Sequence, residues 1–335
     1  MSLVLVIFRK RGLSKEVYTV NKLSSLTRIH RHFKFLLLIL FLILHWTNPS
    51  MARTGKTSKK AQKLVPAALL FWPEERSDYA ILVDKSSQKV LLYRWDNLFA
   101  PVKVYNASTG ENNGPKAKRN DKKTPEGVYF FTDSYEKGEL APRYGTRAFP
   151  LDYPNPIDKK KGRDGYGIWF HGLDKPLKPK DTNGCIALAN PHIDDLANYI
   201  QLNDTPVVIS SRIEMVSPDI LEKEKKQLLK VIEDWRRALE SREIDRYMSF
   251  YGPRFTSDGK NREQWKEYKA LVANKYKEIT VEIQNLQLLK NDGVVMAKFD
   301  QRYSTERLES KGEKRLYLQQ NSTEWKIVGE FFQKE

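Results

Sequence analysis

The sequence predicts two folded domains, a mostly β domain over residues 78–212 and an α+β domain over residues 226–335. Short apolar runs, separated by loops rich in Gly, Pro, Asn and Lys, recur through the first region and are typical of β-strands. The second region begins with amphipathic helices and ends with alternating strands. A chain of 335 residues with 40% hydrophobic and 30% charged residues is long enough for two domains, and its composition excludes wholesale disorder and collagen-like repeats.

The charge and hydropathy pattern of the first 52 residues predicts an export signal or a membrane anchor. Eight basic residues and one acid give this segment +7 of the net +16, and the uncharged run 35–44 follows Arg28, Arg31 and Lys34. That run is short for a bilayer span but matches the apolar core of a signal peptide, and Ser50-Met51-Ala52 supplies small residues for cleavage. We therefore expect an exported protein that is periplasmic or associated with the cell wall. An uncleaved anchor, or a start site placed too far upstream, remains the alternative.

A basic, Pro-interrupted linker is expected over residues 53–77, before the first domain. The apolar runs of that domain predict strands at residues 79–83, 89–93, 102–105, 127–132, 167–170 and 206–209. Between them lie two long polar loops, 106–126 and 150–165, and loops of such length are often functional. Asn190-Pro191 predicts the start of the one clear helix, with Asn190 as its N-cap.

A second linker is expected at residues 213–225, and the α+β domain follows it. The spacing of apolar residues predicts a helix from about 226, a continuation near 244–251 and another helix at 262–276. Four alternating strands follow at 280–289, 293–305, 313–320 and 324–332, with a hairpin turn at Asn291-Asp292-Gly293. The aromatic residues of the helical region are expected in the core, and the alternative is that they line a glycan pocket: Trp235, Tyr247, Phe250 and Tyr251.

The cysteine and histidine content points to nucleophilic chemistry. Cys185 is the single cysteine, so an exported chain has no internal disulfide and must keep this thiol reduced. After the leader, the histidines are His171, at the end of an apolar run, and His192, which is expected at the surface. A thiol becomes a good nucleophile as the thiolate, and an imidazole is the usual base. The alternative interpretation is that Cys185 is a small buried residue and His171 a histidine of the core, neither with a chemical role. No spacing indicates a metal site, and no cofactor is expected.

Residues 78–212 resemble the catalytic domain of the L,D-transpeptidases, the bacterial enzymes that cross-link peptidoglycan. The resemblance rests on His171-Gly172 followed by Thr182-Asn183-Gly184-Cys185. It extends to Ser108-Thr109-Gly110, to 124–129 and to 149–156. It implies a β-sandwich domain in which Cys185 is the nucleophile and His171 its base. Gly184, Asn183, Thr182 and Gly172 would form the oxyanion and substrate-binding part of the site.

Two positions depart from the pattern of that family. Many members carry His two positions before the cysteine and Arg two positions after it, where this chain has Asn183 and Ala187. His171 would then perform all proton transfer. The substrate carboxylate that the missing Arg would contact needs another partner, and Arg143, Arg147 and Arg163 are the candidates.

Residues 226–335 resemble the nuclear-transport-factor-2-like superfamily, α+β cones with a pocket, on the segments 232–238, 245–251 and 325–328. The order of the two domains is also similar to that of the cell-shape-determining L,D-carboxypeptidases of helical bacteria. Transpeptidation of tetrapeptide stems is therefore the leading expectation, and trimming to tripeptides is the alternative. A third hypothesis is that the protein is a wall-binding module with a vestigial site.

The expected partners are the stem peptides of peptidoglycan. The basic charge favours anionic surroundings, but no zinc-finger spacing or aromatic-basic motif accompanies the lysines, so nucleic acid is not expected. Contact with a membrane is expected only through an uncleaved leader. The sequence leaves the oligomeric state and the ligand of the C-terminal pocket open.

Overall fold

The computed structural model describes residues 63–73 and 77–335, and the statements below concern those residues. The predicted leader at 1–52 lies outside them. None of the helices in this part of the chain combines the length and apolar character needed to cross a bilayer.

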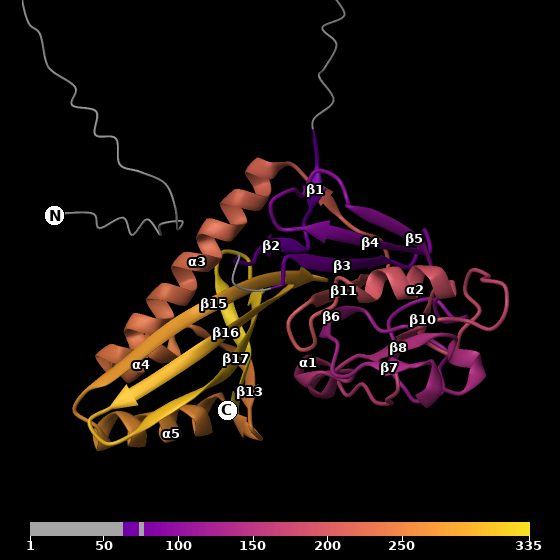
Figure 1. Ribbon diagram of the computed structural model, residues 1–335. Coiled ribbons are helices and arrows are strands. Elements are labelled where there is room, and N and C mark those ends of the chain that lie inside the picture. Colours follow the sequence, from indigo (N-terminus) through magenta and orange to yellow (C-terminus); the bar gives the residue numbers. More distant parts are fainter. Residues whose placement is uncertain (1–62, 74–76) are drawn as a thin grey trace, which may run out of the picture. The chain divides into compact units, whose positions relative to one another are not determined.

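The larger of the two main sheets of the N-terminal domain has five strands (Figure 1). Its order is β5-β4-β3-β11-β6, in which β11 runs parallel to β3 and antiparallel to β6. The strands are β3 (Tyr79–Asp84), β4 (Lys89–Arg94), β5 (Lys103–Asn106), β6 (Gly127–Phe130) and β11 (Pro206–Ser210). All five match the predicted strands closely, because each carries the alternating or continuous apolar residues that a buried strand requires.

A second, four-stranded sheet has the order β10-β9-β8-β7. Its strands are β7 (Tyr135–Glu136), β8 (Arg147–Pro150), β9 (Trp169–His171) and β10 (Ile186–Ala187). Four short helices accompany it: η1 (Lys137–Glu139), η2 (Pro142–Tyr144), α1 (Pro156–Lys160) and α2 (Asn190–Ala197). Apolar residues of both sheets and of α2 form one buried cluster, among them Ile81, Phe131, Phe170 and Ile193. The predicted mostly β domain is confirmed.

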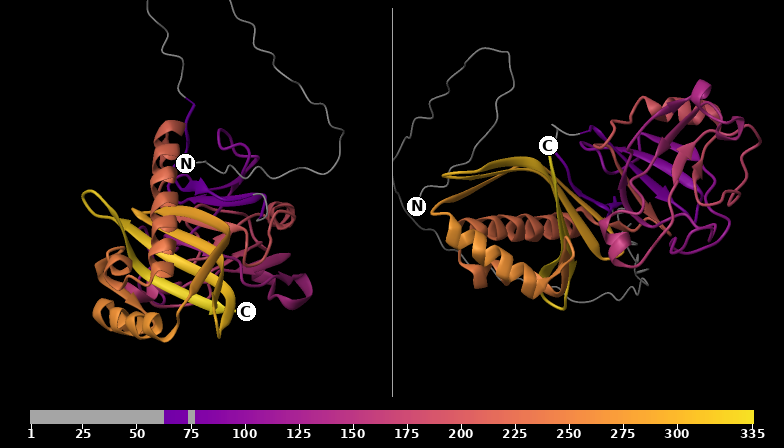
Figure 2. Two further views of the ribbon diagram at one scale, coloured as in Figure 1. Left: turned by 90° about the vertical axis from the view of Figure 1, so that its left-hand side faces the viewer. Right: turned by 90° about the horizontal axis from the view of Figure 1, so that it is seen from below.

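The C-terminal domain is α+β, as predicted. Its helices are α3 (Pro218–Ser241), α4 (Ile244–Met248) and α5 (Arg262–Lys275). The start of α3 at Pro218 corrects the linker expected at 213–225, most of which is helix. The predicted four-strand meander is present as β15 (Ile279–Asn291), β16 (Val294–Thr305), β17 (Glu309–Gln320) and β18 (Trp325–Lys334), each antiparallel to the next. Helices α3 and α5 lie on one side of the curved sheet (Figure 2). They bury Leu228, Ile232, Trp235 and Trp265 against it.

Most of the strands that were not predicted have two to four residues, and one has seven. They are β1 (Val65–Pro66), β2 (Leu69–Phe71), β12 (Met215–Val216), β13 (Tyr251–Ser257) and β14 (Lys260–Asn261), together with β7, β8 and β10. Two of these lie where the sequence suggested a linker before residue 78. β1 pairs with β12, and β2 pairs with β15 as an edge of a seven-stranded sheet of order β14-β13-β18-β17-β16-β15-β2. Strands of two or three residues carry no period that a sequence pattern can reveal.

The two domains are joined by a shared apolar cluster and by buried charges. Ala80, Phe130 and Val208 of the N-terminal domain belong to the same cluster as Met296 and Tyr317 of the C-terminal domain. Around it, the Lys298 ammonium donates to the Asn203 carbonyl oxygen at 3.0 Å, and Arg315 pairs with Asp152 at 2.7 Å. These contacts make the two domains parts of one compact unit.

Candidate active site

Two neighbouring strands bring the predicted nucleophile and base together. β9 and β10 are parallel, with Ile186 opposite Phe170 and Ala187 opposite His171. Cys185 comes directly before β10 and so lies next to Trp169, one side chain along the same face of β9 from His171. Both side chains line one open cleft of about 630 Å³, a size typical of ligand sites.

A backbone carbonyl fixes the orientation of the His171 ring. His171 is 6% exposed, and its Nδ1 lies 2.6 Å from the Gly172 carbonyl oxygen. Because a carbonyl only accepts, Nδ1 carries the proton, and the neutral ring keeps a lone pair on Nε2. Burial lowers the pKa of His171, the hydrogen bond to Gly172 opposes this, and the charge of Arg143 lowers the pKa further. The neutral base is therefore the resting form.

The Cys185 thiol also rests in its neutral form. Burial raises the pKa of Cys185, opposed by the Trp169 backbone N–H and by the charges of Lys116 and Arg143. Its Sγ lies 3.5 Å from the Gly167 carbonyl oxygen, which accepts the thiol proton. A neutral, half-buried thiol of this kind needs a general base at the moment of attack, and His171 is the imidazole in the same cleft.

The turn before Cys185 is held by side-chain hydroxyl groups. The Gly184 N–H donates to Thr182 Oγ1 at 3.1 Å, and the Thr182 hydroxyl donates to the Cys185 carbonyl oxygen at 2.8 Å. Thr124 Oγ1 donates to the Gly184 carbonyl oxygen at 2.9 Å. Gly184 has φ +128°, and a Cβ there would lie 2.7 Å from the Lys123 carbonyl oxygen, so only glycine fits.

This turn changes the expected role of Gly184. Its N–H was expected to bind an oxyanion, but in this arrangement Thr182 occupies it. The backbone N–H of Cys185 has no recorded acceptor within the described residues and is the remaining candidate donor. Thr182 thus shapes the turn and also lines the cleft, while Asn183 is exposed there.

Asn190 holds the loop after His171 instead of capping a helix. The residue before α2 is Ala189, without a side-chain cap, and Asn190 Oδ1 accepts the backbone N–H groups of Thr146 and Leu173 at 3.3 and 3.0 Å. A Cβ on Gly172 would come within 2.2 Å of that oxygen. Gly172 does not line the cleft, and its role in the structure is to supply the carbonyl oxygen that accepts the His171 Nδ1 proton.

His192 lies outside the cleft. Its ring packs against Tyr105 at 5.6 Å between centroids, and it is not among the residues that line the cleft. The neighbouring acids belong to surface ion pairs, Asp194 with Arg147 and Asp195 with Lys103. Across residues 63–73 and 77–335, no three His, Cys, Asp or Glu side chains gather as a metal-ligand set.

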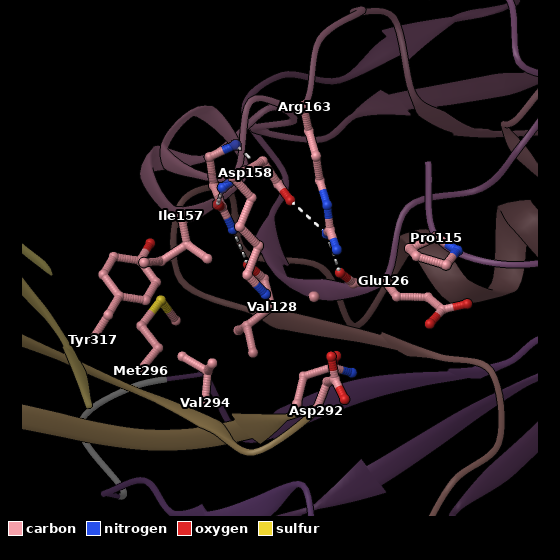
Figure 3. Close-up of a pocket in the computed structure, with 14 residues that line it drawn as sticks. Pro115, Glu126, Val128, Ile157, Asp158, Arg163, Asp292, Val294, Met296 and Tyr317 are labelled. Carbon is pink, nitrogen blue, oxygen red and sulfur yellow. Dashed lines mark hydrogen bonds and ion pairs between the residues drawn. The ribbon is translucent and has the colours of Figure 1, made fainter. Parts of the chain in front are cut away.

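The structure separates the three candidate arginines. Arg143, on η2, lines the cleft. Arg147 pairs with Glu136 at 3.0 Å. Arg163 pairs with Asp158 at 3.0 Å and lines a different, smaller cavity of about 50 Å³ beside Tyr317 and Met296 (Figure 3).

Among the residues of the site that the sequence analysis did not single out are Arg119, Tyr144 and Tyr166, and Asn190 was given a different role there. Arg119 and Tyr166 come from two different polar loops, and both line the cleft. Tyr144 stands edge-on to the His171 ring, 5.1 Å between centroids. An aromatic residue between two glycines, Gly165-Tyr166-Gly167, was a usable signal, because an aromatic side chain in a glycine-rich surface loop is available for binding.

Comparison with known protein families matches both domains. The L,D-transpeptidase catalytic domain matches residues 78–209, and the Cds6 C-terminal NTF2-like domain matches residues 227–331. The Escherichia coli (strain K12) protein YafK, provisionally named an L,D-transpeptidase, is 32% identical over 89 residues, which are 26% of this chain and 32% of YafK. The match thus spans about a third of that relative's length.

Two solved structures match across both domains. Bd1075 of Bdellovibrio bacteriovorus is 31% identical, with a TM-score of 0.71 over 81% of this chain and 99% of that one. The helical cell shape determining protein Pgp2 of Campylobacter jejuni shares the fold at 24% identity, with a TM-score of 0.68 over 79% of this chain and 95% of that one.

Proposed function

Because this chain belongs to the family in which an L,D-transpeptidase catalytic domain precedes an NTF2-like domain, we propose that it is a peptidoglycan L,D-transpeptidase. Cys185 is the nucleophile and His171 the base. The observation that supports this most strongly is the hydrogen bond from His171 Nδ1 to the Gly172 carbonyl oxygen, since it leaves Nε2 basic in the cleft that contains the thiol.

The reaction begins on a tetrapeptide stem. Cys185 Sγ attacks the carbonyl carbon of the third residue, an L-centre, while Nε2 of His171 takes the thiol proton. The C–N bond to the terminal D-amino acid then breaks, and the imidazolium returns the proton to the departing amine. A thioester between Cys185 and the stem remains.

Stabilisation of the oxyanion falls to the backbone in this proposal. The unengaged N–H of Cys185 is the available donor, and Thr182 and Thr124 hold the turn that aims it. One such donor contributes roughly 3 kcal/mol in other acyl-transfer enzymes.

The acceptor decides between transfer and hydrolysis. An amine of a neighbouring stem resolves the thioester into a cross-link, whereas water releases a tripeptide. Hydrolysis, that is L,D-carboxypeptidase activity, is the second candidate, because the order of the two domains resembles that of the cell-shape-determining L,D-carboxypeptidases. In either case we propose a role in the cell wall and in cell shape, outside the cytoplasm.

The test is incubation of purified protein with a disaccharide-tetrapeptide, followed by mass spectrometry. We expect cross-linked dimers, or exchange of the terminal residue for an added D-amino acid, and loss of both in Cys185→Ala. Tripeptide as the sole product would assign the carboxypeptidase.

His192→Gln is the matched control for His171→Gln, because His192 is the other histidine of the described residues and lies outside the cleft. We expect His171→Gln to lose at least about 100-fold in kcat/KM and His192→Gln to retain it. Full activity in Cys185→Ala would end the cysteine mechanism, and a folded wild type without Cys185-dependent product would favour the wall-binding module.

A further inference from the structure

The cleft around Cys185 is basic, but most of its cations are already neutralised. Three of its lysines pair with carboxylates: Lys116 with Asp121 at 2.7 Å, Lys122 with Glu111 at 2.8 Å and Lys175 with Asp181 at 2.8 Å. The two remaining cations in the lining are Arg119 and Arg143, and neither guanidinium forms an ion pair with a carboxylate of the described residues.

Each of these arginines lies over a tyrosine ring. The guanidinium carbon of Arg143 is 4.9 Å from the ring centre of Tyr144, and that of Arg119 is 4.9 Å from Tyr166. Each also donates one hydrogen bond to the same phenol, Arg143 at 3.2 Å and Arg119 at 2.6 Å. A guanidinium has five N–H donors in a rigid fork, so both retain donors for a carboxylate in a preorganised orientation.

Arg143 is the one that lies beside the reacting groups. Tyr144 contacts the Arg143 guanidinium and also stands nearly perpendicular to the His171 imidazole. The charge of Arg143 also lowers the pKa of His171 and the pKa of Cys185, whereas Arg119 affects neither. His171 must lie within hydrogen-bond reach of the amine that departs, so the departing residue binds on the Arg143 side of the thiol.

In a terminal amino acid, one carbon separates that amine from the free carboxylate. We propose that Arg143, supported by Tyr144, binds the free carboxylate of the departing amino acid and makes the site specific for the last residue of a peptide. This inference rests on the acyl transfer proposed above. The bond that breaks is the C–N bond to that residue, which leaves with the thiol proton on its amine and its carboxylate on Arg143.

Binding to protein that cannot turn over tests this directly. In a Cys185→Ala background, calorimetry compares a disaccharide-tetrapeptide that ends in a free carboxylate with the same compound ending in an amide. We expect the acid to bind about 10- to 100-fold more tightly, which is the range for a hydrogen-bonded charge pair. Arg143→Gln in that background should reduce the ratio to about one by weakening the acid alone.

Two matched arginine variants complete the experiment. Arg119→Gln should weaken acid and amide to the same extent, and Arg147→Gln, which removes an arginine outside the cleft, should leave both affinities unchanged. A ratio that persists in Arg143→Gln overturns the assignment, as does equal or absent binding of the two compounds by Cys185→Ala alone. Failure of the proposed reaction is detected separately, as missing Cys185-dependent product from the wild type.

Discussion

At the residue scale, His171 depends on one backbone oxygen. The triad logic of acyl-transfer enzymes calls for a group that orients the base, and here the Gly172 carbonyl does so at 2.6 Å without adding a charge. A neutral orienting group stabilises the imidazolium less than a carboxylate would. Burial and the charge of Arg143 lower the pKa of His171, and the hydrogen bond to Gly172 only partly opposes them.

The pH dependence of kcat/KM follows from that direction. The acidic limb reports protonation of His171 in the free enzyme, and a lowered pKa puts this limb below the usual histidine value of about 6.5. Activity should therefore persist through mildly acidic pH and fall only beneath it. Arg143→Gln removes a positive charge, so its limb should move to higher pH.

Rates measured over roughly pH 4.5 to 8 with saturating acceptor would locate this limb. His192→Gln is the control, and its profile should superimpose on that of the wild type because His192 is remote from the cleft. A wild-type limb above pH 6.5 would contradict the interpretation.

At the element scale, the turn that leads into β10 gives the nucleophile its position. Parallel pairing with β9 sets the register of Cys185 against Trp169 and His171, and Thr182 and Thr124 bind the turn on both of its faces. Part of the motif Thr182-Asn183-Gly184-Cys185 is thus needed to form the turn that positions the nucleophile, in addition to supplying the nucleophile itself. Its threonine satisfies two backbone groups that no strand partner reaches.

Thr182→Val tests that requirement, since valine has nearly the same shape but makes no hydrogen bond. We expect kcat/KM to fall by about 10- to 100-fold, because a loosened turn misdirects both the thiol and the Cys185 N–H. Thr182→Ser should recover most of the loss. Kinetics of both variants beside their melting temperatures would decide, and wild-type rates in a folded Thr182→Val would refute the role.

At the scale of the whole molecule, a buried cation connects the domains. Lys298 on β16 is 0% exposed and contacts the Asn203 carbonyl oxygen, Glu313 at 3.1 Å and the ring of Phe130, at 4.7 Å from the ring centre. Arg315 lies over the same ring, and its partner Asp152 belongs to the segment 149–156. Part of that segment therefore serves domain docking.

Lys298→Ala should lower the free energy of unfolding by about 3 kcal/mol, because it leaves buried acceptors and the Glu313 carboxylate without this cation. Urea denaturation followed by circular dichroism would measure it. Lys277→Ala, at an exposed lysine, is the control and should change the value by less than about 0.5 kcal/mol. Equal effects of the two variants would show that the buried contact adds nothing to docking.

The sequence by itself determined the two domain types. It also determined the strands of the five-stranded sheet in the first domain and the meander in the second. These elements carry enough apolar residues at a regular period for each one to be recognised from its own stretch of sequence. The resemblance built on His171-Gly172 and Thr182–Cys185 gave the family for the same reason, since its residues are close in the chain.

Only the tertiary structure decided which of the three candidate arginines lines the cleft, that Thr182 accepts the Gly184 N–H, and that Asn190 holds the His171 loop and caps no helix. It also turned part of the expected linker into strands β1 and β2. Each of these depends on partners far along the chain. A hydrogen bond or an ion pair between distant residues has no local period, so it exists only once the fold brings its two halves together.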